Sequence, residues 1–167
     1  INDGEVNVTS SDDGINISDP NSDSTTRGGF GTVIDGSLNI KGGKLTVNAS
    51  ADGLDSNGSI NMTGGLVIVN GPESGGDGAL DYDGDFLITG GTLVASGSSG
   101  MAQTPGTSST QNSIAIFLTE TKEANTLVSV KDSKGNEIIT FAPSKTFQSV
   151  IISSADIKTG ETYTVYV

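Results

Sequence analysis

The 167-residue chain contains no cysteine, no histidine and no tryptophan. Without cysteine or histidine it cannot form a disulfide framework, a common structural zinc site, or a Ser-His or Cys-His nucleophile. Basic residues are scarce, since 8 Lys and Arg face 20 Asp and Glu for a net charge of −12. A chain this acidic lacks the basic patch that binds nucleic acid or an anionic membrane surface. No apolar run approaches the roughly 20 residues that span a membrane.

The hydrophobic content is also low, at 33%, and together with the high net charge this is typical of disordered chains. The distribution of the charge argues against disorder. Residues 1–85 have a net charge of −11, residues 86–167 have −1, and 21 of the 24 glycines lie in the first hundred residues. The chain begins at Ile1 with no Met or signal peptide, so we expect a processed form or an excised fragment.

The acidic half is periodic. Gly-Gly pairs begin at positions 42, 64 and 90 within the matching segments 40–47, 62–69 and 88–95, and residues 1–8 fit the same frame. Apolar and polar residues alternate on both sides of each pair, which predicts short β-strands, and no segment has helical periodicity. One such unit cannot bury its own apolar row, so neighbouring units must stack. The pattern predicts an all-β parallel β-helix; a leucine-rich repeat would need a Leu/Asn consensus and a helical segment.

We expect three regions along the chain. Residues 1–100 form the parallel β-helix coils, with a loop excursion at 18–36. Residues 101–113 form a connection rich in Gly, Ser and Thr, and residues 114–167 form a C-terminal antiparallel β cap or small sheet. The excursion and the stretch 96–113 are interpreted as solvated loops, and the five C-terminal lysines as residues of exposed strand edges. The expected C-terminal strands are 114–118, 127–131, 137–141, 147–152 and 162–167, with a hairpin turn at 132–135.

Acidic turns recur at matching positions in these units. In a stacked structure, equivalent residues lie about 4.8 Å apart, so Asp13, Asp52 and Asp77 would form one column. Asn16, Asp55 and Asp81 would form a second column. Two carboxylates ~5 Å apart repel each other by about 3 kcal/mol at an effective dielectric of ~20. Calcium would relieve this repulsion because it takes 6–8 oxygen ligands, although Asp-Gly pairs also form ordinary turns and no EF-hand loop is present. The expected calcium ligands are Asp13, Asn16, Asp52, Asp55, Asn57, Asp77, Asp81, Asp83 and Asp85.

Catalysis is not expected. A polysaccharide lyase would combine calcium with a Lys or Arg base, and the bases of the first half are Arg27, Lys41 and Lys44. Lys41 and Lys44 flank a Gly-Gly corner instead of lying in an acidic turn, so a weak lyase is kept only as an alternative. A glycoside hydrolase would need two opposed carboxylates at a controlled separation, and the column of aspartates could offer such a pair only by accident. Tyr82 is the one aromatic residue among the acidic turns, so it is the candidate for stacking on a sugar, and Lys41 and Lys44 are further ligand-binding candidates.

Several motifs resemble one protein family. They are residues 52–58 (DGLDSNG), 78–84 (GALDYDG) and 96–103 (SGSSGMAQ), with further similarity at 143–150 and 158–165. In them the chain resembles the secreted carbohydrate-binding domain proteins of clostridia and their relatives. The resemblance implies a right-handed parallel β-helix of pectate-lyase-like fold and calcium binding at the acidic turns. It also implies an extracellular or cell-surface location and attachment to plant cell-wall polysaccharide, such as polygalacturonate or cellulose, without established lyase activity.

A protein of another class is the alternative. Because Ile1 aligns with Ile40, the sequence starts part-way through a coil with no cap. An open coil must meet either upstream residues or a neighbouring chain. The alternative is therefore a self-assembling or structural surface protein, joined end to end as a homo-oligomer through its N-terminal coil.

Overall fold

The computed structural model describes residues 1–19 and 33–167. Within these ranges the regular structure is entirely β, with fifteen strands in four sheets, and none of the sheets closes into a barrel. The same ranges contain no helix long and apolar enough to cross a membrane. The expected all-β class with parallel sheets is therefore confirmed.

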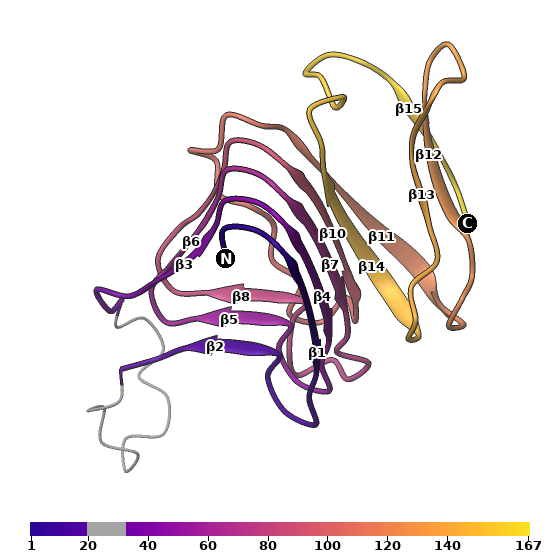
Figure 1. Cartoon of the computed structure of the whole chain (residues 1–167). Coiled ribbons are helices and arrows are strands. Elements are labelled where there is room, and N and C mark those ends of the chain that lie inside the picture. The colour runs from indigo at the N-terminus through magenta and orange to yellow at the C-terminus, as the bar shows by residue number, and fades with distance from the viewer. Residues whose placement is uncertain (20–32) are drawn as a thin grey trace.

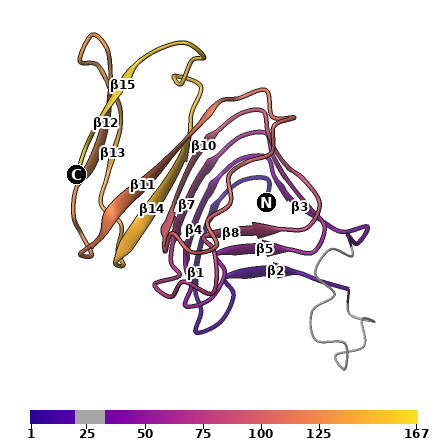
Figure 2. The ribbon, with the colours of Figure 1, turned by 180° about the vertical axis from the view of Figure 1, so that it is seen from behind.

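The first ten strands alternate among three sheets, so that each strand lies parallel to the strand three places earlier. The front and back views show the strands of each sheet side by side (Figures 1 and 2). Sheet A contains β1 (Glu5–Thr9), β4 (Lys44–Asn48), β7 (Leu66–Asn70) and β10 (Thr92–Gly97). Sheet B contains β2 (Ile15–Ile17), β5 (Leu54–Ser56) and β8 (Leu80–Tyr82). Sheet C contains β3 (Ser37–Ile40), β6 (Ser59–Met62) and β9 (Phe86–Ile88).

The strand register follows the spacing of the Gly-Gly pairs. Lys44 pairs with Leu66 and Leu66 with Thr92, so that equivalent residues are 22 and 26 positions apart in the sequence. The segments interpreted as polar turns contain the strands of sheet B, which the sequence analysis did not predict. These strands are only three residues long, which is too short for an alternation of apolar and polar residues to be recognised. The expected excursion separates β2 from β3, and its residues 20–32 lie outside the described part of the chain.

The core lies between the three parallel sheets. Alternate residues of the strands from β3 to β10 point inward and most are almost fully buried, whereas those of β1 and β2 are at most partly buried. Many of the inward residues are small, so the low hydrophobic content is sufficient. Gly43, Gly65 and Gly91, the second residues of the Gly-Gly pairs, have φ angles of 77°, 87° and 90°. Only glycine adopts this left-handed region at little cost, which explains why the corners keep it. The inward residues include Leu38, Ile40, Leu45, Val47, Leu54, Ile60, Met62, Val67, Val69, Leu80, Phe86, Ile88, Leu93 and Ala95.

The C-terminal part is antiparallel. Strands β14 (Phe147–Ser153) and β11 (Ser113–Lys122) extend sheet A beyond β10. Strands β13 (Glu137–Phe141), β12 (Val128–Asp132) and β15 (Tyr163–Tyr166) form sheet D, which stands beside this extension (Figure 1). A second apolar core joins the two sheets and includes Val94, Val150, Val128 and Val130. All five expected C-terminal strands are present.

The sequence predicts a solvated loop after β10. The structure shows instead that this connection forms hydrogen bonds with the parallel sheets. The Gly106 N–H donates to the Phe86 carbonyl, and the Gln111 N–H donates to the Ile88 carbonyl. The Tyr82 hydroxyl donates to the carbonyl of Thr104 at 2.6 Å. The connection thus covers the last strands of sheets B and C, because their edge groups need partners.

The five C-terminal lysines do not all occupy exposed edges. Lys131 lies on β12, the central strand of sheet D. Lys145 is partly buried, and its ammonium donates to the carbonyl of Ala49. Beside it, the Ser144 N–H donates to Asn70 Oδ1 at 2.9 Å and the Ser144 hydroxyl to Asn48 Oδ1 at 2.8 Å. The turn between β13 and β14 therefore attaches the C-terminal part to the parallel sheets.

Candidate functional site

The strands of sheet B place Asn16, Asp55 and Asp81 in one column. Asn16 pairs with Asp55 and Asp55 with Asp81, as the sequence predicts. These side chains point outward, because their neighbours Leu54 and Leu80 are fully buried. We call this column, together with Asp13, Asp52, Asp83 and Gln103, the acidic face.

Amide side chains flank the two central carboxylates of the column. Asn16 Nδ2 donates to Asp55 Oδ2 at 2.6 Å and to Asp13 Oδ2 at 3.0 Å. On the other side, Gln103 Nε2 donates to Asp81 Oδ1 at 2.6 Å. Gln103 was not among the predicted site residues. It lies in the segment 96–103, so the motif resemblance is the one signal that could have found it.

The column predicted for Asp13, Asp52 and Asp77 is only partly present. Asp13 Oδ1 accepts the N–H of Asp52 at 3.1 Å, and Asp52 Oδ1 accepts the N–H of Gly78 at 2.6 Å. Asp77 is one position out of step, because residues 77–81 contain one residue more than residues 52–55. Its carboxylate instead accepts the Ser74 hydroxyl at 3.0 Å. The prediction that Asp77 continues the column is wrong.

The remaining predicted ligands are less central. Asn57 Nδ2 donates to Asp83 Oδ2 at 3.4 Å, which joins the loops that follow β5 and β8. The Asp85 carboxylate lies against Gly106, in the connection that covers β9. The main chain of Asp85 pairs with β6, because its carbonyl accepts the N–H of Ile60 at 2.8 Å.

Burial and mutual repulsion raise the pKa of three carboxyl groups on the acidic face. Desolvation is the larger cause and neighbouring aspartates add to it. The pKa of Asp52 rises to about 6 and that of Asp55 to about 7, while the pKa of Asp81 also rises. Each of these groups is therefore harder to ionise than an exposed aspartate. They favour a proton or another cation.

The donor chemistry suits calcium, but the arrangement is not a closed cage. Among residues 1–19 and 33–167, no group of three or more acidic side chains is placed to hold a metal ion. Several carboxylate oxygens already accept hydrogen bonds from Asn16, Gln103 and main-chain N–H groups. Calcium takes 6–8 oxygens, so binding here would need oxygens besides those of the acidic side chains. Calcium binding stays a prediction.

The basic candidates lie apart from this chemistry. Lys44 belongs to sheet A, and its Nζ is 2.9 Å from Glu5 Oε1. This ion pair holds the pKa of Glu5 below its usual value. Lys41 is exposed at the preceding corner, and its main-chain N–H donates to the carbonyl of Ile1. Arg27 lies outside the described residues.

Tyr82, the predicted stacking residue, is packed into the structure. Its hydroxyl donates to Thr104, and its ring lies edge-on to Phe86 with centroids 6.0 Å apart. Burial raises the pKa of its phenol, with a smaller effect from Asp85. Tyr82 therefore packs beside the acidic face and holds the connection at Thr104 against β8.

Comparison with protein families, curated proteins and solved structures finds no match to this chain.

Proposed function

We propose that this protein binds acidic polysaccharide through calcium at the acidic face, without cleaving it. The carrying observation is the set of half-buried carboxylates, Asp52, Asp55 and Asp81, whose pKa values are raised. Near neutral pH a divalent cation relieves their repulsion without requiring protonation. The ion then presents positive charge on a surface that would otherwise repel anions.

The incomplete donor set favours a ligand that shares the ion. The carboxylates of a polyuronate such as polygalacturonate would supply the oxygens that the protein lacks. The net charge of −12 repels such a polymer unless a cation lies between the two. Protein and polysaccharide would therefore depend on calcium together.

For the fold, we propose a right-handed parallel β-helix, in which the outward column of sheet B forms a rigid, linear binding surface. Calcium sites of extracellular modules are weak, with dissociation constants of about 10⁻⁴–10⁻³ M, and an open site suits such an environment. The motif resemblance to secreted carbohydrate-binding domain proteins favours the same ligand and an extracellular location. Membership of that family is part of this proposal.

Affinity electrophoresis through gels containing polygalacturonate tests the function. With calcium, the wild-type protein should be retarded, and a chelator should abolish the retardation. The double variant Asp55→Asn/Asp81→Asn should lose it as well. A control with the same charge change, Glu120→Gln/Glu123→Gln in the exposed C-terminal part, should keep it. Retardation that ignores both chelator and double variant would contradict the proposal.

The composition of the site supports the proposed absence of catalysis. The three strands of sheet B contain no Lys or Arg that could remove a proton from a sugar. Incubation with polygalacturonate should therefore yield no unsaturated products. Their appearance, and their loss on replacement of Lys41 or Lys44, would instead support the lyase alternative.

The self-assembling protein remains the second candidate because of one observation. Val6 of β1 is 37% exposed, whereas Leu45 and Val67, its partners in β4 and β7, are 1% and 0% exposed. The apolar row is thus uncovered at the first strands of the parallel sheets. Light scattering over a range of concentrations tests this candidate, and a strict monomer counts against it.

A further inference from the structure

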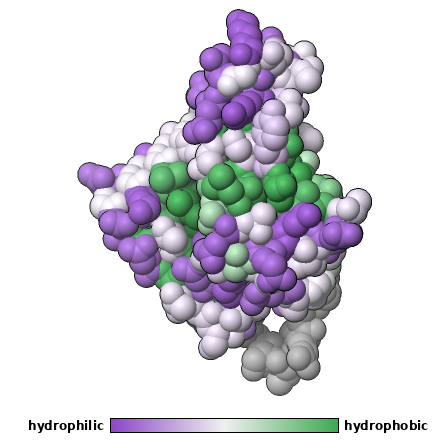
Figure 3. Space-filling model, turned by 90° about the vertical axis from the view of Figure 1, so that its right-hand side faces the viewer, coloured by the Kyte–Doolittle hydropathy of each residue, from purple (hydrophilic) through white to green (hydrophobic). Residues whose placement is uncertain are grey.

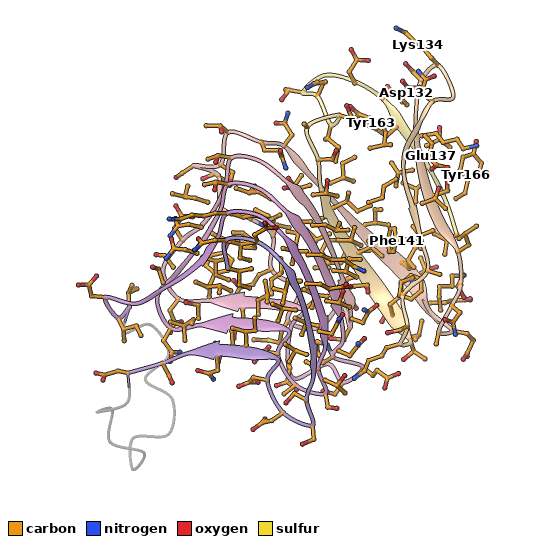
Figure 4. All side chains as sticks on the ribbon, viewed as in Figure 1. Asp132, Lys134, Glu137, Phe141, Tyr163 and Tyr166 are labelled. Atoms are coloured by element: carbon orange, nitrogen blue, oxygen red, sulfur yellow. The ribbon has the colours of Figure 1, made fainter. Side chains whose placement is uncertain are left out.

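The two sides of sheet D differ in chemistry. Val128 and Val130 are buried in the second core, and Phe141 packs against it. The intervening residues point the other way. Figure 4 shows Phe141 on the side toward the parallel strands, with Tyr166 and Glu137 on the opposite side.

The strand register defines this outer side, which we call the outer face of sheet D. Ser129 pairs with Thr140 on β13 and with Tyr166 on β15. Lys131 pairs with Thr164 and, beyond a register shift after Val130, with Glu137. The Thr140 hydroxyl donates to the Ser129 hydroxyl at 2.9 Å. The outer face therefore consists of hydroxyl groups, one cation, one anion and one aromatic ring.

Tyr166 is the unusual member of this face. It is 55% exposed, although aromatic side chains gain most from burial. The ammonium of Lys131 lies 5.6 Å from the centre of its ring, which fixes the ring over the sheet by a cation–π contact. Tyr166 lies on the edge strand β15, and Lys131 lies on the central strand β12, which is paired on both sides.

A sugar ring matches these groups. Its C–H face packs on an aromatic face, where the ring carries negative charge density. Its hydroxyls can pair with Ser129, Thr140 and Thr164, which both donate and accept, with the donor Lys131 and with the acceptor Glu137. An apolar peptide would leave these polar groups without partners. Figure 3 shows a hydrophobic band below the hydrophilic hairpin on this side of the molecule, and an apolar peptide would fit that band better.

The charge of the face selects among sugars. Lys131 and Glu137 cancel, so this face neither attracts an anionic polymer nor contains a group of acids that needs a cation. The charge of the whole chain disfavours polyanions. We propose that the outer face of sheet D binds a neutral polysaccharide without metal, with one sugar ring packed on Tyr166. The proposal extends the polysaccharide-binding function to a second surface.

Affinity electrophoresis in gels containing a soluble neutral β-glucan, run with a chelator, tests this proposal. The wild-type protein should be retarded and Tyr166→Ala should migrate as in a glucan-free gel. Tyr166→Phe should remain retarded, because the ring is kept. Phe117→Ala is the matched control and should also remain retarded, since Phe117 is a similarly exposed aromatic residue (56%) on β11. Circular dichroism of each variant verifies folding.

Two results would overturn the proposal. One is unchanged migration of the wild-type protein in neutral glucan. The other is equal retardation of wild type and Tyr166→Ala. The proposed calcium-dependent function is judged separately, because it requires calcium, polygalacturonate and the aspartates of sheet B. A protein that binds only polygalacturonate, and only with calcium, would support that function and refute this second surface.

Discussion

At the scale of single residues, aspartates in this protein have opposite electrostatic roles. Asp55 is half-buried among other carboxylates, and its pKa rises to about 7. Asp132 is exposed and accepts hydrogen bonds from Asn136 and from the N–H of Lys134, which lower its pKa. Neutralising the first should stabilise the metal-free protein near neutral pH, whereas neutralising the second should not.

The raised pKa values predict how the stability of the metal-free protein depends on pH. Asp52 and Asp55 bind protons more tightly in the folded state than in the unfolded state, where the ordinary value is 3.8. The stabilisation is therefore complete below about pH 4 and is lost as the pH rises through about 6 to 7. Both groups are half-exposed, so we expect a loss of about 1 kcal/mol, or about 2–4 °C in Tm.

Thermal melts in chelator at about pH 5 and about pH 8 measure this effect. Asp55→Asn should reduce the difference between the two melts, and Asp132→Asn should not. Added calcium should raise the Tm at the higher pH. A Tm that rises with pH in the presence of chelator would contradict the raised pKa values described for Asp52 and Asp55.

Gly53 gives a second prediction at this scale. A Cβ at Gly53 would overlap the side chain of Val69 and the carbonyl oxygen of Ala79. Gly53→Ala should destabilise the fold by about 1–3 kcal/mol, because the packed core cannot move aside. Gly75→Ala is the control, since a Cβ there meets no atom within 4 Å. Chemical denaturation of both variants measures their free energies of unfolding. Equal values would contradict the packing described.

Much of the acidic face could be predicted from single residues. Alignment of the acidic turns places Asn16, Asp55 and Asp81 in one column, and the strand register confirms it. The same alignment misplaces Asp77, because an inserted residue changes which side chain reaches the column. The contact between Tyr82 and Thr104 depends on a connection with no regular pattern, so no local signal reveals it.

At the scale of elements, the connection from residue 98 to 112 contains no strand, yet it forms hydrogen bonds with the edge of β9 that a further strand would otherwise form. Ser109 illustrates this, because its hydroxyl accepts the Ile88 N–H at 3.0 Å and donates to the Phe86 carbonyl at 3.1 Å. Composition predicts a loop at these residues, and a loop is present. Its role could not be predicted, because hydrogen bonds to an edge strand need no alternation of apolar residues.

This role predicts a local effect of Ser109→Ala. The Ile88 amide loses its acceptor, so its hydrogen exchange should accelerate about fivefold, as expected for the loss of about 1 kcal/mol. Ser108→Ala, at an exposed neighbour, should leave the exchange unchanged. Exchange followed by NMR provides the measurement. An unaffected Ile88 amide would mean that the edge of β9 does not depend on this side chain.

At the scale of the whole molecule, the two ends of the parallel sheets differ. β14 covers β10, and the connection covers β8 and β9, whereas β1, β2 and β3 each have one parallel neighbour. The alternation and the Gly-Gly spacing predict the stacking of these strands. Sequence cannot predict how β11 and β14 join sheet A, because antiparallel pairing over this distance has no local signal.

The difference between the ends predicts a gradient of stability. Amides of β1 and β2 should exchange faster than those of β7–β9, because their apolar side chains are only partly covered and these first strands can open locally. Exchange at low protein concentration measures the gradient. Slower exchange in β1 and β2 at high concentration would indicate association of chains through this end. Uniform protection at low concentration would contradict the prediction.

The constant register of sheet B has a consequence for recognition of a polymer. Each parallel strand adds one outward position at a fixed interval, and a polysaccharide also presents its groups at a fixed interval. Weak contacts between two such lattices combine through avidity, since the first contact raises the effective concentration of the next. How closely the two intervals match decides how many contacts form at once. Lengthening the stack by another set of strands would therefore change affinity stepwise, with no new kind of contact.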